Sequence, residues 1–476
     1  MRKSIILAVV LMVALVAVPA FASVQNVKVS GDIDSTYLYR GNFDFGQSTN
    51  NIEDINQSVF ITQTRLRVDA DLTDQVSATV ALINERVWGN DNHNVLAETT
   101  PTDIDLNLAY VTLREMLYSP LTIIVGRQAF SYGNSLIIDT GGATATDSGL
   151  IAAATDLGNQ SAMDAVRLVF DYNPLTLEVL YAKIDENTAT FAFDNIRDDI
   201  DLYGVNATYE LGDDLNTQVE AYFFARIDKN SGSNNAGTPG SAASNKADTV
   251  YVPGLRASAD VLDGLNIQGE IAWQRGTNVS NTADAADVES RDALAVQLVS
   301  NYQIPNDILP DVLEEYNPAI GYTYTYVSGD SNPTDTGTDD VGGVQASTNI
   351  DTAWDSLFES QGGGTIYNTM FNLTNLQIHS VSFTANPIED VTTKVTWNGL
   401  WLDKKIDSAV PTTTQAIQRP DGGGTYTLAA DNGKTNLGYE IDVDAIYDYT
   451  EDVQIGASLG WFVPGNVFTG LNDTTA

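Results

Sequence analysis

The chain has 476 residues, in which 63 aspartates and glutamates oppose only 23 lysines and arginines, giving a formal net charge of −40 at pH 7. Phosphate backbones would repel so acidic a chain, which argues against nucleic acid as a partner. The absence of cysteine excludes disulfide frameworks, thiolate metal sites and cysteine nucleophiles. The surplus carboxylates are expected on solvated loops, where they can also bind divalent cations at the surface.

Residues 1–22 have the layout of a secretory signal peptide. Arg2 and Lys3 precede an apolar run over 5–18, and Ala20-Phe21-Ala22 supplies the small residues that a signal peptidase needs. We therefore predict cleavage before Ser23. The alternative, a membrane-anchoring helix, would need about 20 apolar residues. No later stretch comes near that length, and no cysteine is present to carry a lipid anchor.

The rest of the chain is built from strand-like segments. Apolar and polar side chains alternate most strictly over 59–72, 215–228, 437–449 and 453–463. The apolar face often ends in aromatic residues, such as Trp397 and Trp401, whereas the charges fall on the opposite face. Aromatic residues gather at a water–lipid boundary, and a charge facing lipid at mid-depth would cost roughly 2–4 kcal/mol. The pattern predicts an all-β fold, a transmembrane antiparallel β-barrel, in preference to a soluble β-sandwich.

Short and long connections alternate along the chain. Tight turns rich in Asp, Asn, Gly and Pro fall at 72–74, 118–120, 173–174, 212–214, 263–264 and 450–452. Long polar connections fall at 41–57, 89–103, 129–163, 185–198, 229–247, 277–290, 328–372 and 405–435. In a bacterial barrel the short turns face the periplasm and the long loops face outside. Segment 303–315 is an unusually long periplasmic connection, in which we expect a short helix.

The segments add up to about seventeen strands, whereas a bacterial barrel with both ends in the periplasm needs an even number. The last strand, 453–463, runs outward, and the residues that follow it begin an external loop. A returning strand that ends in an aromatic residue is expected next, which would make about eighteen. We therefore predict one outer-membrane barrel domain over 23–476, truncated at its C-terminus and exported through the periplasm.

Several short motifs, each present once, are spread in order over most of the mature chain. They are Gln63-Thr64-Arg65-Leu66-Arg67 with Asp71-Leu72-Thr73-Asp74, Gly126-Arg127-Gln128 with Tyr132-Gly133, Asp164-Ala165-Val166-Arg167-Leu168, Ser328-Gly329-Asp330, Trp354-Asp355-Ser356-Leu357-Phe358 and Pro464-Gly465. This ordered set resembles the alginate-export family of outer-membrane barrels. The resemblance implies about eighteen strands and a pore lined by basic residues that select an anionic polysaccharide. Carried over by motif, the basic residues are Arg65, Arg67, Arg127 and Arg167.

The alternation of the strands adds further charged residues to the predicted pore lining. The basic ones are Arg226, Arg256 and Lys394, and the acidic ones are Asp105, Glu178, Glu220, Glu270, Glu440, Asp442 and Asp444. The balance is mixed or mildly acidic, and it would repel a polyanion unless the arginines cluster at the narrowest point. Arg65 and Arg67 share a face and form either a selectivity rung or a ladder neutralised by neighbouring acids. The acid ladder over 440–444 either favours cations or pairs with basic residues across the strand.

Catalysis and cofactor binding are not expected. The only histidines are His93 and His379. His379 and Ser380 are neighbours on a predicted strand, so their side chains point to opposite faces and cannot form a nucleophile–base pair. No glycine-rich phosphate loop precedes a helix, and the acidic stretch 330–340 departs from the spacing of a calcium loop. We therefore expect neither a cofactor nor a dedicated metal site.

Three functions fit this sequence. The first is a porin-like channel for passive diffusion of small hydrophilic or anionic solutes, narrowed by an infolded loop, for which the small and apolar segment 129–163 is the candidate. The second is export of an anionic, alginate-like polysaccharide. The third is a structural or adhesive surface barrel with acidic loops and a plugged lumen. All three place the barrel in outer-membrane lipid.

Overall fold

The computed structural model describes residues 25–42, 45, 56–89, 104–140, 157–158, 162–185, 199–229, 247–281, 286–311, 313–330, 350–361, 363–405 and 434–468. The predicted signal peptide and His93 lie outside these residues. Within them, no helix combines the length and the hydropathy needed to cross a membrane.

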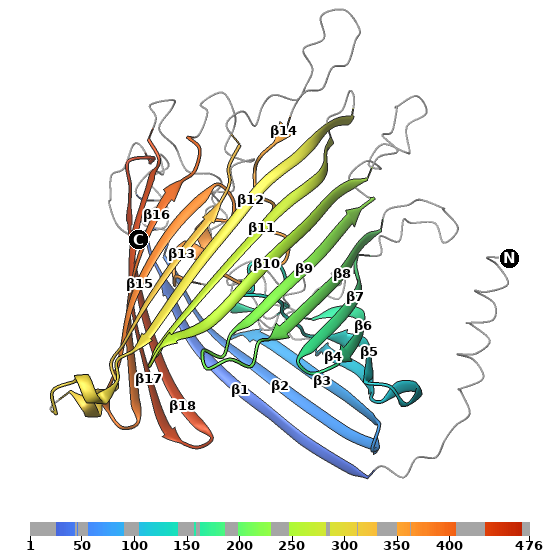
Figure 1. Cartoon of the computed structure of the whole chain (residues 1–476). Coiled ribbons are helices and arrows are strands. Elements are labelled where there is room, and N and C mark those ends of the chain that lie inside the picture. The colour runs from blue at the N-terminus through green and yellow to red at the C-terminus, as the bar shows by residue number, and fades with distance from the viewer. Residues whose placement is uncertain are drawn as a thin grey trace, which may run out of the picture.

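A single sheet of eighteen strands forms the wall of the described part of the molecule (Figure 1). The strands are β1 (Asn26–Arg40), β2 (Gln57–Thr73), β3 (Val76–Val87), β4 (Asp105–Leu113), β5 (Leu121–Gln128), β6 (Met163–Asp171), β7 (Leu175–Asp185), β8 (Ile200–Glu210), β9 (Gln218–Asp228), β10 (Asp248–Leu262), β11 (Leu265–Asn281), β12 (Ala286–Gln303), β13 (Ala319–Val327), β14 (Ile350–Asp351), β15 (Leu376–Ile388), β16 (Val391–Leu402), β17 (Asn436–Thr450) and β18 (Val453–Pro464). Each of the strands other than β14 pairs antiparallel with the long strands that stand before and after it in sequence. The two-residue β14 pairs parallel with β12. The predicted antiparallel barrel, with its count of about seventeen membrane strands, is confirmed.

The connections follow the predicted alternation. Short turns gather at one end of the barrel, the lower end in Figure 1, and the long connections leave the other end. The short helix expected over 303–315 is present as two 3-10 turns, η3 (Asn306–Ile308) and η4 (Glu314–Tyr316). The long loop predicted over 277–290 is wrong, because β11 and β12 stay paired up to Asn281 and Ala286. Backbone hydrogen bonds continue this hairpin past side chains whose polarity had indicated a loop.

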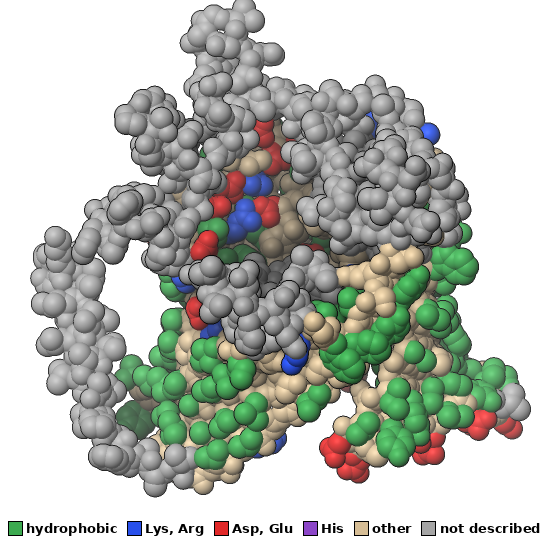
Figure 2. All heavy atoms as spheres, turned by 180° about the vertical axis from the view of Figure 1, so that it is seen from behind, with side chains coloured by type: hydrophobic (Ala, Val, Ile, Leu, Met, Phe, Trp, Pro, Cys, Tyr) green, Lys and Arg blue, Asp and Glu red, His purple; other side chains and the backbone are tan. Residues whose placement is uncertain are grey.

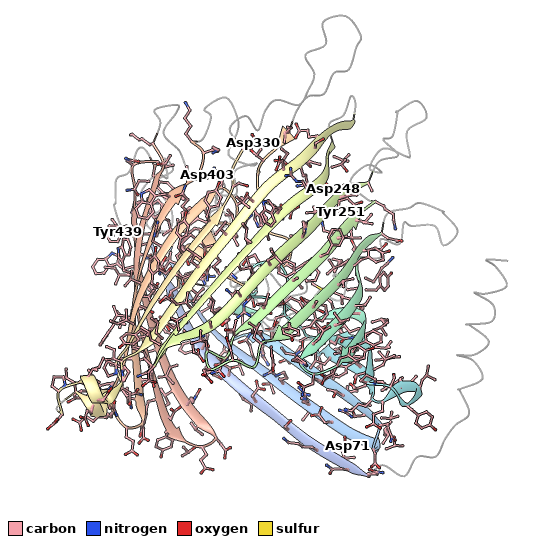
Figure 3. All side chains as sticks on the ribbon, viewed as in Figure 1. Asp71, Asp248, Tyr251, Asp330, Asp403 and Tyr439 are labelled. Carbon is pink, nitrogen blue, oxygen red and sulfur yellow. The ribbon has the colours of Figure 1, made fainter. Side chains whose placement is uncertain are left out.

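Outward-facing side chains are mostly apolar, as the alternation predicts. On β3, Val80 and Leu82 are 44% and 37% exposed, whereas the intervening Ala81 is buried. Aromatic residues on the outer face include Tyr251 and Tyr439, which Figure 3 shows near the loop end of the barrel. Leu437 was expected to share this face but is fully buried. Its neighbour Gly438 has φ +131°, and the register shifts nearby, so the alternation is interrupted there.

The inner face differs from a uniformly charged lumen. Toward the loop end of the wall, buried inward side chains are apolar, and they include Leu180, Leu202, Phe224, Val252, Ala295, Leu400 and Phe462. Further acidic residues lie at strand ends, where Figure 3 shows Asp248, Asp330 and Asp403 at the loop end and Asp71 at the turn end. Apolar side chains inside a membrane barrel need a cover other than water, and two chain segments folded into the lumen provide it.

Candidate channel constriction

The first infolded segment, residues 129–140, follows β5 and turns into the barrel. Its side chains Phe130, Leu136, Ile137 and Ile138 are each at most 7% exposed, and they join the apolar cluster of the inner wall. The hydrophobic run over 136–138 explains the inward turn, because burying it removes apolar surface from water. The predicted infolding of loop 129–163 is therefore seen over the described residues 129–140.

Three wall carboxylates hold the tip of this segment, residues 132–134. Glu178 on β7 accepts a hydrogen bond from the Tyr132 hydroxyl, Glu220 on β9 accepts one from the Gly133 amide at 3.0 Å, and Glu270 on β11 accepts one from the Asn134 amide at 2.7 Å. Gly133 has φ +61°, and a Cβ there would lie 2.6 Å from Glu270 Oε1. Glycine is needed at this tip because it permits both the left-handed backbone and the close carboxylate.

The same connection reaches a distant part of the wall. Leu157 lies further along it, and its carbonyl accepts a hydrogen bond of 2.6 Å from Gln63 Nε2 on β2. Leu157 also packs against the fully buried Ile61. The connection between β5 and β6 thus touches β7, β9 and β11 with its first part and β2 with its later part. The two described parts of this connection therefore contact different parts of the wall.

The second infolded segment, residues 350–375, lies mostly within the connection 328–372, which was expected to face outside. That expectation is wrong for the described residues: Trp354, Phe358, Tyr367 and Met370 are each at most 7% exposed. The backbones of the two infolded segments are joined by a parallel bridge between Ile138 and Phe358. Dispersed aromatic residues among polar ones hid this burial from a composition-based prediction.

Acidic residues on β17 anchor the second infolded segment. The two carboxylate oxygens of Glu440 accept hydrogen bonds from the amides of Ile366 and Tyr367, each at 2.7 Å. Asp442 accepts one from the amide of Thr365 at 3.3 Å. These two members of the predicted acid ladder are buried. The third, Asp444, accepts a hydrogen bond of 2.7 Å from the Ser458 hydroxyl on β18.

A buried ion cluster fixes the beginning of the same segment. Arg226 on β9 contacts Asp355 at 2.7 Å and Asp248 at 3.3 Å. Arg291 on β12 contacts Asp248 at 2.8 Å. Burial raises the pKa of Asp355, but the guanidinium groups of Arg226 and Arg291 outweigh burial and hold that pKa below its ordinary value. Of these residues the sequence had indicated only Arg226, because the other partners come from far along the chain.

Each arginine in the predicted pore lining has a carboxylate partner. Arg65 pairs with Asp32 at 2.9 Å, Arg67 with Asp69 at 2.8 Å, Arg127 with Asp164 at 3.8 Å, Arg167 with Glu178 at 2.6 Å and Arg256 with Glu220 at 3.8 Å. Lys394 faces Asp444 in the register of β16 and β17. Figure 2 shows such basic and acidic side chains side by side in the hollow at the loop end.

The exposure of these arginines separates them into two groups. Arg65 and Arg67 are 44% and 41% exposed, whereas Arg167 and Arg256 are 18% and 12% exposed. Arg256 also donates a hydrogen bond of 2.5 Å to the Asn134 side chain, so it supports the first infolded segment. Arg127 lies two residues after Val125 and therefore on the same face of β5, and Val125 is 44% exposed. Its partner Asp164 is 66% exposed. Arg65 and Arg67 are therefore the arginines of this set that water and solutes can reach most freely.

Three solved structures illustrate what this chain is similar to. OccK2 (OpdF) of Pseudomonas aeruginosa, solved in complex with glucuronate, has a TM-score of 0.51 and 10% identity, covering 95% of each chain. OpdK of the same organism has a TM-score of 0.49 and 11% identity, covering 95% of this chain and 96% of the OpdK chain. The outer-membrane channel DcaP of Acinetobacter baumannii has a TM-score of 0.41 and 15% identity, covering 81% of this chain and 94% of the DcaP chain. No curated protein sequence matches the chain.

The family comparison covers nearly the whole chain. Residues 26–476 match the model of a family described as alginate export. The likeness to OccK2, at 10% identity, shows a shared barrel fold. Together the fold, the outward apolar face and the family match make this protein a β-barrel of the outer membrane, as the sequence predicted. The chain belongs to the alginate export family.

Proposed function

We propose that this barrel passes small hydrophilic solutes by diffusion, including small anions, and that its two infolded segments set the size limit. The observation that carries the proposal is the pair of inner-wall contacts made by the described parts of the β5–β6 connection, residues 132–134 on β7, β9 and β11 and Leu157 on β2. Chain packed against the inner wall at these places leaves less room for a solute than an empty bore would.

The anchors favour a fixed constriction over a swinging plug. A hydrogen bond to a charged group contributes about 1.5–3 kcal/mol. Glu440 accepts two amides of the second infolded segment, and Glu220 and Glu270 each accept one of the first. A long polymer could pass only if several such contacts broke together. A small solute needs no such rearrangement.

Export of an anionic polysaccharide is the second candidate. Family membership and the half-exposed pair Arg65 and Arg67 support it. Asp32 and Asp69 neutralise these two arginines, so the pair offers a polyanion little net positive charge. Divalent cations at the acidic loops stay a prediction, since much of those loops lies outside the described residues.

Planar-bilayer recording of the purified chain tests these functions against one another. With the potassium salt of a uronic acid and then of its long polymer, we expect discrete open steps and current carried by the monomer but not by the polymer. Polymer translocation would replace the proposal with export. A complete absence of open steps would replace it with a structural, plugged barrel.

A further inference from the structure

A group of four charged side chains lies at the loop ends of β7, β8 and β9, three strands that stand side by side in the wall (Figure 1). Lys183 belongs to β7, Asp199 immediately precedes β8, Asp201 belongs to β8 and Lys229 directly follows β9. We call these four residues the outward charged cluster. None of them belongs to the predicted pore lining, so the proposed diffusion path does not account for them.

The cluster points away from the lumen. Two positions from Lys183 toward the turn end, on the same face of β7, lies Tyr181, and two positions from Asp201 on β8 lies Tyr203. These tyrosines are 39% and 42% exposed, and their ring centroids are 5.3 Å apart. Val205 continues the same apolar face toward the turn end. Hydrocarbon covers such a face and aromatic rings mark its boundary, so the charges that come next stand at the depth of the lipid headgroups.

The two aspartates hold the two lysines side by side. Both ammonium groups contact the same oxygen of Asp199, Oδ2, Lys183 at 3.0 Å and Lys229 at 3.8 Å. Asp201 contacts Lys183 at 3.4 Å and Lys229 at 2.9 Å, and it accepts a hydrogen bond of 3.1 Å from the Tyr181 hydroxyl. The Asp201 side chain is 6% exposed, whereas those of Lys183 and Lys229 are 25% and 32% exposed. The buried acid therefore fixes two ammonium groups that reach the surface.

Lys229 keeps hydrogen-bond donors for a ligand. An ammonium group carries three N–H donors. Among the residues that the structure describes, the Lys229 side chain donates a hydrogen bond to Asp201 alone. Phosphate oxygens accept charge-assisted hydrogen bonds from such a group. A phosphate on a lipid headgroup would reach the cluster from the outward side, at the depth that Tyr181 and Tyr203 mark.

A similar arrangement recurs on the neighbouring strands β10, β11 and β12. Arg275 on β11 pairs with Asp292 on β12. Trp273 lies two positions from Arg275 toward the turn end, on the same face of β11, and Tyr251 stands opposite Arg275 in the register of β10 and β11. An acid–base pair again follows the outward aromatic residues. The recurrence indicates that the charges belong to the membrane boundary rather than to one hairpin.

We propose that the outward charged cluster binds the phosphate of an anionic lipid headgroup in the outer leaflet. Lys183 and Lys229 are the ligands, and Asp201 positions them. The outer leaflet is the relevant one because the long loops of bacterial barrels are extracellular. Asp199, the more exposed of the two acids, contacts both ammonium groups and competes with the headgroup for them. The site is independent of what the lumen passes.

Binding of a phosphorylated lipid to the purified whole protein tests the proposal. Diphosphorylated lipid A is titrated into the protein in neutral detergent, and native mass spectrometry measures the bound fraction. Lys183→Gln with Lys229→Gln should weaken binding at least about fivefold, the effect of roughly one lysine at an anionic surface. Lys183→Arg with Lys229→Arg keeps both charges and should bind like the natural protein. Lipid A without its phosphates should bind the natural protein as weakly as the glutamine variant.

The matched control removes the same charge from the inner face. Arg65→Gln with Lys394→Gln should leave lipid A binding unchanged, because both residues belong to the predicted pore lining. Heat-modifiable mobility on a gel confirms that each compared variant is a folded barrel. An equal loss of binding in this control, or no loss in the glutamine variant of the cluster, would overturn the proposal.

The competing acid supplies a test of opposite sign. Asp199→Asn removes a carboxylate from both ammonium groups, so lipid A binding should strengthen severalfold. If the cluster only held the strand ends together, removing Asp199 would destabilise the barrel, as removing the lysines would, and would not strengthen binding. Unchanged or weaker binding in Asp199→Asn would therefore overturn the proposal. Displacement of lipid A by an equal concentration of inorganic phosphate would also overturn it, because the site would then belong to a dissolved anion.

Discussion

Replacing Glu440 with glutamine should release the second infolded segment. Both carboxylate oxygens of Glu440 accept an amide, from Ile366 and Tyr367, at 2.7 Å. The glutamine has one carbonyl oxygen, so one of these two amides would face an NH2 group instead of an acceptor. An unsatisfied buried donor costs about 1–3 kcal/mol. Since 1.4 kcal/mol is tenfold, the released population should rise roughly 5- to 150-fold.

Single-channel recording would detect this release as larger and noisier open steps in Glu440→Gln than in the natural protein. Asp444→Asn is the matched control, because it removes one acid from the same strand but contacts Ser458 on β18 rather than the infolded segment. The control should match the natural protein in open-state noise, because it leaves the anchors of the infolded segment intact. If Glu440→Gln matched Asp444→Asn in step size and open-state noise, the anchoring role of Glu440 would be refuted.

Two further predictions concern charge. We expect the half-exposed Arg65 and Arg67 to face the path, so neutralising both as glutamines should shift the reversal potential toward cations by severalfold in permeability ratio. Arg275 is 54% exposed on the opposite face of its strand, so Arg275→Gln should leave the reversal potential unchanged. No shift in the double variant would remove both arginines from the path. Burial raises the pKa of Glu359 to about 7. Because its folded pKa lies above the ordinary value of about 4.5, Glu359 contributes its full stabilisation below about pH 4.5 and loses it as the pH rises through 7. Open-state noise should therefore grow between pH 5 and 8 in the natural protein and stay flat in Glu359→Gln. A pH-dependent Glu359→Gln channel would contradict this assignment.

The wall of the barrel was predictable because its signal is local. Alternation over 59–72 placed Arg65 and Arg67 on the inner face and Leu66 on the outer one. The structure confirms these positions. Alternation fails where the backbone departs from the regular pleat. Gly438, with φ +131°, interrupts the alternation beside Leu437, and no residue-type pattern announces that change.

The constriction was only half predictable, because its contacts are distant in sequence. The small and apolar composition of the connection 129–163 indicated the first infolded segment. The second was hidden by the polar composition of its connection, and its anchors join residues as far apart as Arg226 and Asp355. The acid ladder on β17 was visible, but its role as an acceptor of backbone amides depends on chain segments that only the fold brings together.

Solute-size exclusion tests the narrowed lumen most directly. Vesicles containing the purified protein are placed in isotonic solutions of neutral saccharides of increasing length, and their swelling rates are measured. The infolded segments predict fast swelling with monosaccharides and a steep decline within the first few sugar units, with the decline moved to longer sugars in Glu440→Gln. Equal swelling rates for a monosaccharide and a long oligosaccharide in the natural protein would contradict a lumen crossed by residues 129–140 and 350–375.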